Sequence, residues 1–333
     1  MKRVLVTGGA GYIGSHTLKV LVDKEIPVVV LDTLATGYRE AIPSQIPFYQ
    51  GDIADADLVN HIVKQHFVDS VIHFAARSLV GESVAKPDFY FYENTSKTTQ
   101  LLSILVQNNV KKVVFSSTAA VYGIPQEIPI PETSVTSPIN PYGLSKLMIE
   151  QSMYWLEQAY GLQWIALRYF NAAGASFDGF IGEDHSPETH VIPLILQAAL
   201  GQHPAIQIYG TDYDTPDGTC IRDYIHVLDL AEAHVQALNA LDRGLPSRAF
   251  NVGTGQGFSV REVIEAAKRV TGRSINVVET ERRAGDSAIL IAKVDEIKHS
   301  LGWQPRYSDL ETIMKTAWNW HLKNPNGFAS EFL

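Results

Sequence analysis

Short apolar runs alternate with longer amphipathic stretches through the first half of the chain. Five runs have the length and the β-branched content of buried strands. They are Val4–Val6, Val28–Leu31, Val71–Phe74, Val113–Phe115 and Trp164–Leu167. The stretches between them, near residues 13–26, 54–66, 88–109 and 141–160, have the apolar spacing of helices. This alternation favours an α/β fold, a doubly wound parallel sheet with helices on both faces. Such a sheet binds ligands beyond the carboxyl ends of its strands.

The pattern changes after Asn171. Residues 172–190 are rich in Gly, Ser and acidic side chains and predict a long loop. Further helices are predicted near 191–201, 228–242, 259–271 and 309–323, with strands near 206–209 and 249–252. We therefore predict two domains. Residues 1–171 plus 223–256 form the sheet domain, and residues 172–222 plus 257–333 form a smaller α/β domain.

Composition narrows the function classes. The 333 residues are 45% hydrophobic, and 27 basic against 36 acidic side chains give a net charge of −9. No basic run could neutralise a phosphate polymer, so we expect neither a nucleic acid polymer nor a membrane as partner. Cys220 is the single cysteine, so no internal disulfide can form and a reducing, cytoplasmic location is expected. The histidines show no metal-ligand spacing, and no metal site is predicted.

A glycine cluster follows the first predicted strand and precedes the first predicted helix. Gly8, Gly11 and Gly14 have the spacing G-x-x-G-x-x-G. The first glycine permits a tight turn, the second lets backbone approach a pyrophosphate, and the third lets the helix pack close to the strand. The helix N-terminus then offers amide groups to phosphates. This context predicts a Rossmann-type dinucleotide site.

Acidic residues end the next two predicted strands. Asp32 ends the second strand, where a carboxylate accepts from the adenosine ribose hydroxyls and repels a 2′-phosphate. It therefore favours NAD over NADP, with a capping Asp in a turn as the alternative. Asp52 follows a third strand and could accept from the adenine amino group.

Tyr142 and Lys146 lie four residues apart at the start of a predicted helix, so they share one face. An adjacent ammonium and a positively charged nicotinamide would lower the pKa of the tyrosine and let it act as a base. An exposed Tyr/Lys pair on a solvated helix is the alternative. The run Ser116-Ser117-Thr118 lies at the carboxyl end of a buried strand. A hydroxyl there favours the catalytic interpretation because it can hydrogen-bond an alcohol and relay its proton.

Together these motifs resemble the extended short-chain dehydrogenase/reductase family. The second half resembles, within that family, the UDP-glucose 4-epimerases. The motifs that carry this resemblance are Arg168–Asn171, Gly182–Asp184, Asp217–Thr219, Arg222–Val227 and Arg283-x-x-Asp286. The resemblance covers roughly residues 1–328. It implies that the sheet domain binds NAD and that the smaller domain binds a UDP-sugar.

The resemblance assigns residues to both ligands. Thr118, Tyr142 and Lys146 would be catalytic and would also touch the cofactor, and the first two would touch the substrate as well. The other NAD contacts would be Gly8, Gly11, Tyr12, Ile13, Gly14, Asp32, Thr33, Leu34, Thr36, Gly37, Asp52, Ile53, Phe74, Ala75, Ala76, Ser78, Asn94 and Phe170. The other substrate contacts would be Asn171, His190, Val191, Gln207, Ile208, Tyr209, Arg222, Arg283, Asp286 and Leu290.

Side-chain chemistry agrees with the substrate set. Two arginines supply the permanent charge and the several donors that a diphosphate needs, and Asp286 can accept from ribose hydroxyls. Without the resemblance, Arg222 could equally pair with Asp223 or Asp217, and Arg283 could be a solvated surface charge. The family is usually dimeric through the helices near 88–109 and 141–160, which implies a homodimer.

The activity that the resemblance implies inverts carbon 4 of the sugar. Tyr142 would take the proton of the 4-hydroxyl, through or beside Thr118, while hydride moves to NAD and leaves a 4-keto sugar and bound NADH. The keto sugar would turn over and the hydride would return, interconverting UDP-galactose and UDP-glucose. The nucleotide would supply affinity while the sugar stays free to turn.

Four residues depart from the family pattern. Thr118 stands where many members have Ser, Lys97 replaces a usual Gly, and His190 replaces a frequent Asn. Leu290 stands where some members have a bulky Tyr, which suggests extra room near the sugar 2-position and acceptance of UDP-N-acetylhexosamines.

Two other functions compete with this assignment. A nucleotide-sugar 4,6-dehydratase would need an Asp and a Glu after Thr118, whereas Ala119 and Ala120 stand there. A reductase on the same scaffold remains open. A non-catalytic NAD-binding protein would be expected to lack Tyr142 or Lys146, and this chain has both.

Overall fold

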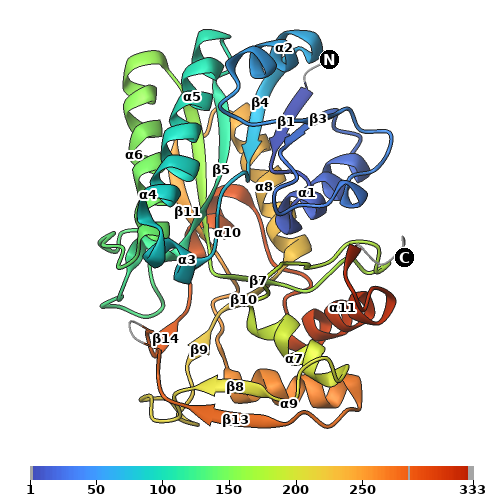
Figure 1. Ribbon diagram of the computed structural model, residues 1–333. Helices are drawn as coiled ribbons and strands as arrows, with labels where there is room; N and C mark the ends of the chain where they lie inside the picture. The colour runs from blue at the N-terminus through green and yellow to red at the C-terminus, as the bar shows by residue number, and fades with distance from the viewer. Residues whose placement is uncertain (1–2, 284–285, 329–333) are drawn as a thin grey trace.

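Seven parallel strands form the main sheet of the computed structural model, which describes residues 3–283 and 286–328 (Figure 1). Their order across the sheet is β11-β6-β5-β4-β1-β2-β3. Their bounds are β1 Arg3–Thr7, β2 Val28–Asp32, β3 Phe48–Gln50, β4 Val68–His73, β5 Lys112–Thr118, β6 Gln163–Tyr169 and β11 Arg248–Val252. The chain returns from β3 to place β4 beside β1. The strand order therefore reverses between β1 and β4, which is where such sheets bind ligands.

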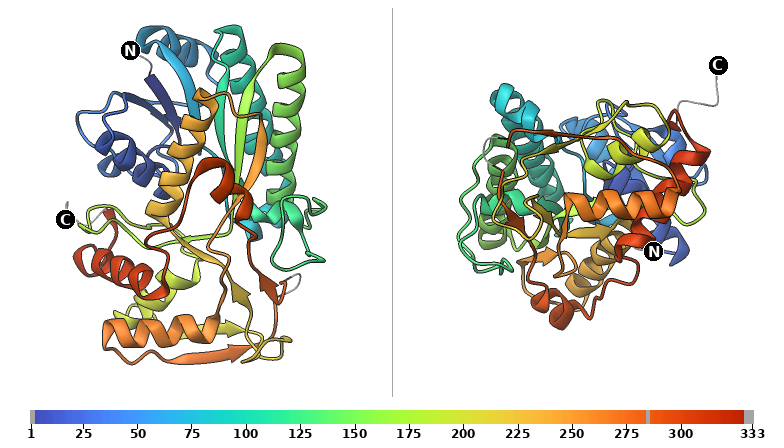
Figure 2. Two further views of the ribbon diagram at one scale, coloured as in Figure 1. Left: turned by 180° about the vertical axis from the view of Figure 1, so that it is seen from behind. Right: turned by 90° about the horizontal axis from the view of Figure 1, so that it is seen from below.

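Helices cover both faces of this sheet because successive strand residues point to opposite sides. Leu5 belongs to the buried cluster under one set of helices, whereas Val4 and Val6 belong to the cluster under the other. The first set is α2 (Ala56–His66), α5 (Lys97–Gln107) and α6 (Pro141–Tyr160). The second is α1 (Tyr12–Asp23), α8 (Val227–Asp242) and α10 (Asp295–Leu301), seen from behind in Figure 2. These layers confirm the predicted fold class.

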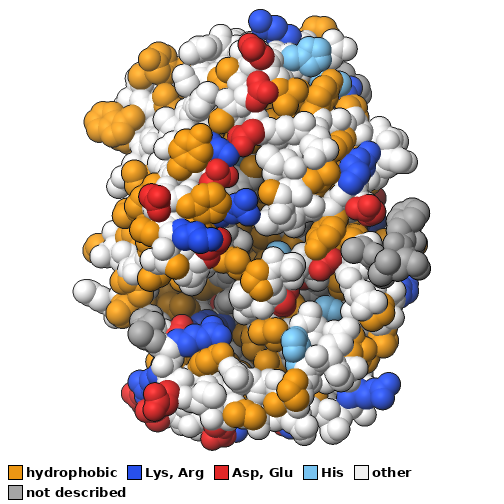
Figure 3. All heavy atoms as spheres, in the orientation of Figure 1, with side chains coloured by type: hydrophobic (Ala, Val, Ile, Leu, Met, Phe, Trp, Pro, Cys, Tyr) orange, Lys and Arg blue, Asp and Glu red, His pale blue; other side chains and the backbone are white. Residues whose placement is uncertain are grey.

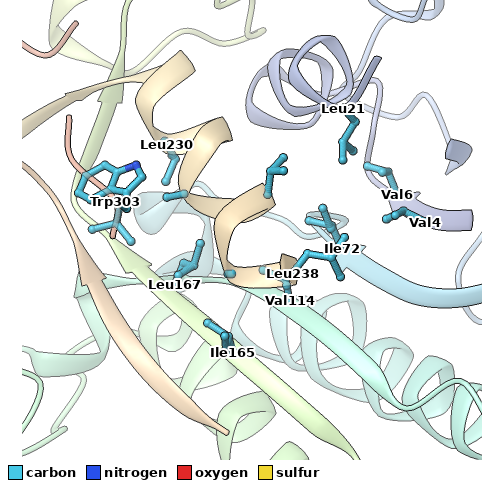
Figure 4. Close-up of a cluster of buried hydrophobic side chains, with 14 of the residues drawn as sticks. Val4, Val6, Leu21, Ile72, Val114, Ile165, Leu167, Leu230, Leu238 and Trp303 are labelled. Carbon is cyan, nitrogen blue, oxygen red and sulfur yellow. The ribbon is translucent and has the colours of Figure 1, made fainter. Parts of the chain in front are cut away.

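The face under α8 is filled by aliphatic side chains from several strands. Figure 4 shows Leu230 and Leu238 of α8 among Ile72, Val114 and Ile165 of the sheet. Each of these side chains is at most 4% exposed. Burial of such side chains contributes roughly 1.5–3 kcal/mol each, which is what holds the carboxyl ends of the strands in register.

The single helix predicted near 88–109 is three helical pieces. They are α4 (Pro87–Tyr90), a π-helical turn at Phe91–Ser96, and α5. A further short helix, α3 (Val80–Ala85), precedes them. A π turn widens the helix by one residue and is frequent at functional sites. Here it contains the fully buried Asn94. Two 3₁₀ turns, Arg39–Ala41 and Ala119–Tyr122, complete this half.

The smaller part lies below the carboxyl ends of the main strands (Figure 1). It contains three helices, α7 (Val191–Ala199), α9 (Val260–Thr271) and α11 (Leu310–Lys323). Their apolar faces share a buried cluster with the strand pair β8–β13. The strands of this half are β7 Asn171–Ala173, β8 Ile206–Tyr209, β9 Ile221–Arg222, β10 Tyr224–His226, β12 Phe258–Ser259, β13 Val277–Thr280 and β14 Ile289–Leu290.

The long loop predicted at 172–190 begins inside a strand. β7 pairs in parallel with β10, so that Asn171 lies opposite Tyr224. These strands are too short to show a period in the sequence, and tertiary pairing decided them. From β10 the chain returns to the main sheet through α8 and β11. No helix within residues 3–283 and 286–328 has the length and apolar content needed to cross a membrane.

Candidate functional site

The glycine loop joins β1 to α1 with little space for side chains. Gly8 has φ 73°, and a Cβ there would lie 2.4 Å from the Ala75 amide nitrogen. A Cβ on Gly14 would lie 2.2 Å from the Gly8 carbonyl oxygen. Gly11 is different, because the nearest atom to its Cβ would be 3.5 Å away. The first and third glycines are thus required by packing, and the second leaves the N-terminus of α1 open to a phosphate.

No side chain among the described residues caps the N-terminus of α1, and its first turn contains no acidic residue. Tyr12 and Ile13 form that first turn. An anion placed there would meet unshielded amide dipoles. Residues 33–37 lie beside it, since the Tyr38 amide donates to the Ala10 carbonyl at 3.1 Å and Gly37 packs against Ala10. Thr33 and Thr36 are exposed within that segment.

Asp32 ends β2, and its carboxylate fits both predicted roles, the cap of a turn and the ribose contact. One oxygen accepts from the Leu34 amide at 2.8 Å, which is a turn, and the other accepts from the Ala10 amide at 2.9 Å. Burial raises its pKa. Each carboxylate oxygen can accept a second hydrogen bond, so ribose hydroxyls can still be received. Leu34 takes a left-handed conformation with φ 60° to complete this turn.

Asp52 is already ion-paired within the protein. Its Oδ2 lies 2.6 Å from the Lys97 ammonium, and its Oδ1 accepts from the Ala54 amide at 2.9 Å. Lys97 also lies 2.7 Å from Glu93. Lys97 had no assigned role in the sequence, and it lies beside an expected adenine contact. The neighbouring side chain of Ile53 is buried in the sheet core.

The segment after β4 lies along the ligand edge of the sheet. The amides of Phe74 and Ala75 both donate to the Thr7 carbonyl, at 2.9 and 3.1 Å. Ala76 and Ser78 follow on the same segment. Asn94 fixes its far end, because it exchanges hydrogen bonds with the Arg77 backbone at 2.7 and 3.0 Å and donates to Ser145 at 3.0 Å. The π-helical turn therefore ties this segment to α6.

Tyr142, Lys146 and Thr118 meet at the carboxyl end of β5. Asn140 caps α6 by accepting from the Gly143 amide at 2.8 Å, and Pro141 occupies the first turn. This start places Tyr142 in hydrogen-bonding contact with Thr118. One turn later, the Lys146 ammonium donates to the Ser116 carbonyl at 3.0 Å. The trio predicted from the sequence is thus assembled, with all three side chains buried.

Burial dominates the electrostatics of this trio. Burial raises the pKa of Tyr142, nearby Tyr169 raises it further, and a hydrogen bond from Thr118 acts in the opposite direction. Burial also lowers the pKa of Lys146 to about 7. The Lys146 ammonium lies 6.0 Å from the centre of the Tyr142 ring and donates to a carbonyl instead. The protein's own groups therefore favour the protonated phenol. The predicted lowering needs the positive nicotinamide as well as the Lys146 ammonium, and it stays a prediction.

A buried polar network that the sequence did not reveal supports the strand ends. Ser117 donates to Glu150 at 2.5 Å, and Arg168 forms a bidentate pair with the same carboxylate. Arg168 also donates to Tyr122 at 3.0 Å, and Tyr122 donates to Asn251 at 2.7 Å. The network joins β5, α6, β6 and β11. Each member is satisfied, so it holds Thr118 and α6 in a fixed relation.

The expected substrate contacts Asn171, Arg222 and Leu290 lie on β7, β9 and β14, and Arg283 and Asp286 lie just before β14. We call this set of residues the lower rim. Asp223 holds Asn171 in place, because its backbone carbonyl accepts hydrogen bonds from both the backbone amide and the side chain of Asn171. Arg222 pairs with Asp286 at 3.5 Å, and not with Asp223 or Asp217, whose carboxylates accept from other groups. Arg283 stacks on the Tyr209 ring at 3.8 Å.

Leu290 lies where the two halves meet. It pairs opposite Arg222 in β14 and packs with Phe170 against a small buried cluster around Tyr122. An expected nicotinamide neighbour and an expected sugar neighbour therefore pack against the same cluster. Figure 3 shows the surface hollowed at this level, between the part with the main sheet and the smaller part below.

Three predicted substrate contacts, Ile208, Val191 and His190, have side chains that already pack or hydrogen-bond within the protein and are less available to a ligand. The side chain of Ile208 is 1% exposed and packs inside the smaller part, so only its backbone could meet a ligand. Gln207, on the same strand, is exposed. Val191 packs against the same core. His190 directs Nδ1 to Glu183 at 2.5 Å.

Comparison with known proteins agrees with this geometry. Residues 4–253 match the model of the NAD dependent epimerase/dehydratase family. The UDP-glucose 4-epimerase of Halalkalibacterium halodurans is 53% identical over 328 residues, 98% of each chain. The crystal structure of UDP-glucose 4-epimerase from Brucella ovis in complex with NAD superposes with a TM-score of 0.93 and 46% identity, covering 96% of this chain and 98% of that one.

A second solved structure is that of UDP-glucose 4-epimerase from Bifidobacterium longum in complex with NAD+ and UDP. It has a TM-score of 0.92 and 39% identity over 98% of this chain and 100% of that one. The likeness thus extends over both the main sheet and the smaller part. The chain belongs to the NAD dependent epimerase/dehydratase family, among its UDP-glucose 4-epimerases.

Proposed function

We propose that this chain interconverts UDP-galactose and UDP-glucose by inverting carbon 4 of the sugar. The observation that carries the proposal is the buried trio of Thr118, Tyr142 and Lys146 at the carboxyl end of β5. It lies on the strand next to the point where the sheet order reverses. Acid–base groups and a dinucleotide loop therefore share one crevice, as a redox-neutral epimerisation requires.

The residues present fit NAD as the cofactor. Gly11 leaves room above the start of α1, and no described side chain caps that helix. The pyrophosphate would lie against Tyr12 and Ile13, the adenosine ribose against Asp32, and the nicotinamide against Phe170. Bound there, NAD would supply reversible hydride transfer at sugar carbon 4.

The chain's own residues manage the proton. Thr118 Oγ1 and the phenol oxygen of Tyr142 form one hydrogen-bonding pair, which would receive the 4-hydroxyl proton and give it back. Burial keeps the phenol protonated when only protein groups surround it. A positive nicotinamide ring beside Tyr142, together with Lys146, would favour the phenolate. Lys146 would hold the nicotinamide ribose and keep the phenol in place.

The lower rim would bind the nucleotide and leave the hexose free to turn. Arg222 and Arg283 provide permanent charge for the diphosphate, and Asp286 lies 3.5 Å from Arg222, ready to accept from uridine hydroxyls. Asn171 offers a donor and an acceptor at the boundary between nucleotide and sugar. Binding energy placed on the part of the substrate that does not react permits the sugar to present either face.

We also propose that the enzyme is a cytoplasmic homodimer. Cys220 is buried and is the chain's single cysteine, which suits a reducing compartment. Apolar side chains gather along α6 on the left edge of Figure 3. Leu144, Met148 and Trp155 share one face of that helix and are 39%, 37% and 68% exposed. A second copy that presents the same surface would cover them.

Proton NMR of UDP-galactose incubated with purified protein and NAD tests the activity. UDP-glucose signals are expected, and Tyr142→Phe should lower turnover by about 10²- to 10⁴-fold while UDP and NAD still bind. Thr118→Ser should retain most of the activity and Thr118→Ala should not. Tyr160→Phe, at the exposed far end of α6, is the control. A product without its 6-hydroxyl would instead assign a 4,6-dehydratase.

A further inference from the structure

Four metal-binding side chains converge on the segment between β7 and α7. They are Glu183, His185, Glu188 and His190, and one potential ligand atom from each lies within 4.8 Å of every other. Glu183 is buried, His185 and Glu188 are half-buried, and His190 is exposed. The pattern E-x-H-x-x-E-x-H brings the four together because Ser186 and Pro187 turn the chain between two pairs spaced by two residues. This spacing differs from the familiar zinc motifs, so the sequence alone did not identify the set.

The distances suit one small cation. Tetrahedral zinc with ligands at 2.0–2.2 Å has neighbouring donor atoms about 3.4 Å apart. His185 Nδ1 lies 3.5 Å from Glu183 Oε1 and 3.6 Å from Glu188 Oε2. His190 Nδ1 lies 3.6 Å from Glu188 Oε1. Only the contact of His190 with Glu183, at 2.5 Å, is a direct hydrogen bond that would have to open by about 1 Å.

The cluster also has an unmet polar atom. His185 Nδ1 is buried and has no hydrogen-bond partner among the described residues, although it faces both carboxylates. Its ring stands edge-on to that of His190, with centroids 5.3 Å apart, so two imidazoles converge from different directions. Two carboxylates and two neutral imidazoles would leave two negative charges, one of them on the buried Glu183. A dication would balance that charge and ligate His185, in place of the protons that balance it when the two histidines form ion pairs with the glutamates.

We propose that these four residues form a structural site for a divalent transition-metal ion of the zinc class. Two imidazole nitrogens favour zinc over magnesium or calcium, which prefer oxygen ligands. Four protein ligands complete a tetrahedron and leave no open position, which is typical of structural zinc rather than catalytic zinc. The acid–base groups of the proposed reaction, Tyr142 and Lys146, are not part of this cluster, whereas His190 is also an expected substrate contact.

The ion would join three parts of the fold. Glu183 accepts from Trp320 of α11 through its carbonyl at 3.2 Å, His190 precedes α7, and His185 packs 6.3 Å from the ring of Tyr12 in α1. A metal on His190 Nδ1 would leave Nε2 for other partners. The site would therefore brace the segment that connects the main sheet to the smaller part, beside the start of the cofactor helix.

Metal titration of the whole protein tests this site. The full chain is stripped with a chelator, dialysed and titrated with Zn²⁺ against a chromophoric competitor. One Zn²⁺ per chain is expected, with a dissociation constant at least tenfold lower than in His185→Ala or Glu188→Gln. His203→Ala removes an exposed histidine that hydrogen-bonds Gln197 outside the cluster, and it should bind as the parent does. Co²⁺ in place of Zn²⁺ should give the intense visible absorption of a tetrahedral site.

Two results would overturn the proposal. One is Zn²⁺ binding of equal strength in the parent, His185→Ala and Glu188→Gln, which would place the ion elsewhere. The other is no stoichiometric binding, which would mean that the cluster is a set of ion pairs with protonated imidazoles. Glu188→Gln keeps the shape of the side chain, and circular dichroism of each stripped variant separates lost binding from lost folding. The test uses no substrate and is independent of the proposed epimerisation.

Discussion

The Lys97 ammonium lies 2.6 Å from the Asp52 carboxylate and joins α5 to the segment after β3. Lys97 lies also 2.7 Å from Glu93, so one cation neutralises two acids. These carboxylates raise the pKa of Lys97 and keep it charged. A residue that departs from the family pattern thus holds an expected adenine contact in place.

Lys97→Met should weaken NAD binding. Without the ammonium, Asp52 loses its orientation and adds uncompensated negative charge near a negatively charged cofactor, so the dissociation constant should rise about three- to tenfold. Calorimetric titration of the cofactor-stripped protein with NAD measures it. Lys315→Met removes a surface lysine paired only along its own helix with Glu311 and is the control. Unchanged affinity in Lys97→Met would mean that Asp52 does not face the adenine.

Asp32→Asn should relax the choice between NAD and NADP. The amide keeps one oxygen for the Leu34 amide but loses the charge that repels a 2′-phosphate. The NADP-to-NAD affinity ratio should rise about tenfold or more, and the ratio cancels any general loss of binding. Asp57→Asn removes an exposed acid from the first turn of α2 and should leave the ratio unchanged. A constant ratio in Asp32→Asn would assign that carboxylate to the turn alone.

Leu290 sets the room beside the sugar in our proposal, and Leu290→Tyr should reduce it. The protein should turn over UDP-N-acetylglucosamine at more than a hundredth of the UDP-glucose rate. Leu290→Tyr should lower the former at least tenfold and the latter by less than about threefold, because a larger ring obstructs the acetamide selectively. Leu290→Met, which nearly conserves volume, is the control. Equal losses for both sugars would remove Leu290 from the specificity argument.

Trp155→Glu should yield a monomer. A charge placed on the 68% exposed indole face of α6 would be desolvated in any pairing of two α6 surfaces. Light scattering coupled to size-exclusion chromatography measures the mass, with a halving expected at micromolar concentration. The control is Val278→Glu, which introduces the same charge on an exposed side chain of β13 in the smaller part. A parent protein that is already monomeric would reject the proposed dimer.

His234 should make the protein acid-sensitive. It is fully buried in α8, and burial lowers its pKa to about 4. Between about pH 6.5 and pH 4 the unfolded chain binds this proton and the folded chain does not, so the free energy of unfolding falls as the pH falls. His234→Leu should reduce that slope by up to about 1.4 kcal/mol per pH unit, measured by urea unfolding. Exposed His203→Leu provides the comparison, and equal slopes would contradict the assignment.

Sequence patterns predicted most of the main sheet. The signal is strong there because each strand is buried on both faces and forms a continuous apolar run. Val29 packs in the cluster on one face and Val30 in the cluster on the other. The same reasoning merged α4, the π turn and α5 into one helix, since their polar positions keep a helical spacing. The division into two domains, drawn from composition, stays a prediction.

The amino-acid sequence by itself determined the glycine loop, the end of β2 at Asp32 and the pairing of Tyr142 with Lys146 on one helical turn. Each is local, because the spacing of neighbouring residues decides it. Tertiary structure alone decided what surrounds those groups. It buried Tyr142 and Lys146 and raised the pKa of the phenol, it joined Lys97 to Asp52, and it gathered Glu183 with His185. Burial and contacts between residues distant in sequence determine these pKa values and pairings, and a local sequence pattern predicts neither.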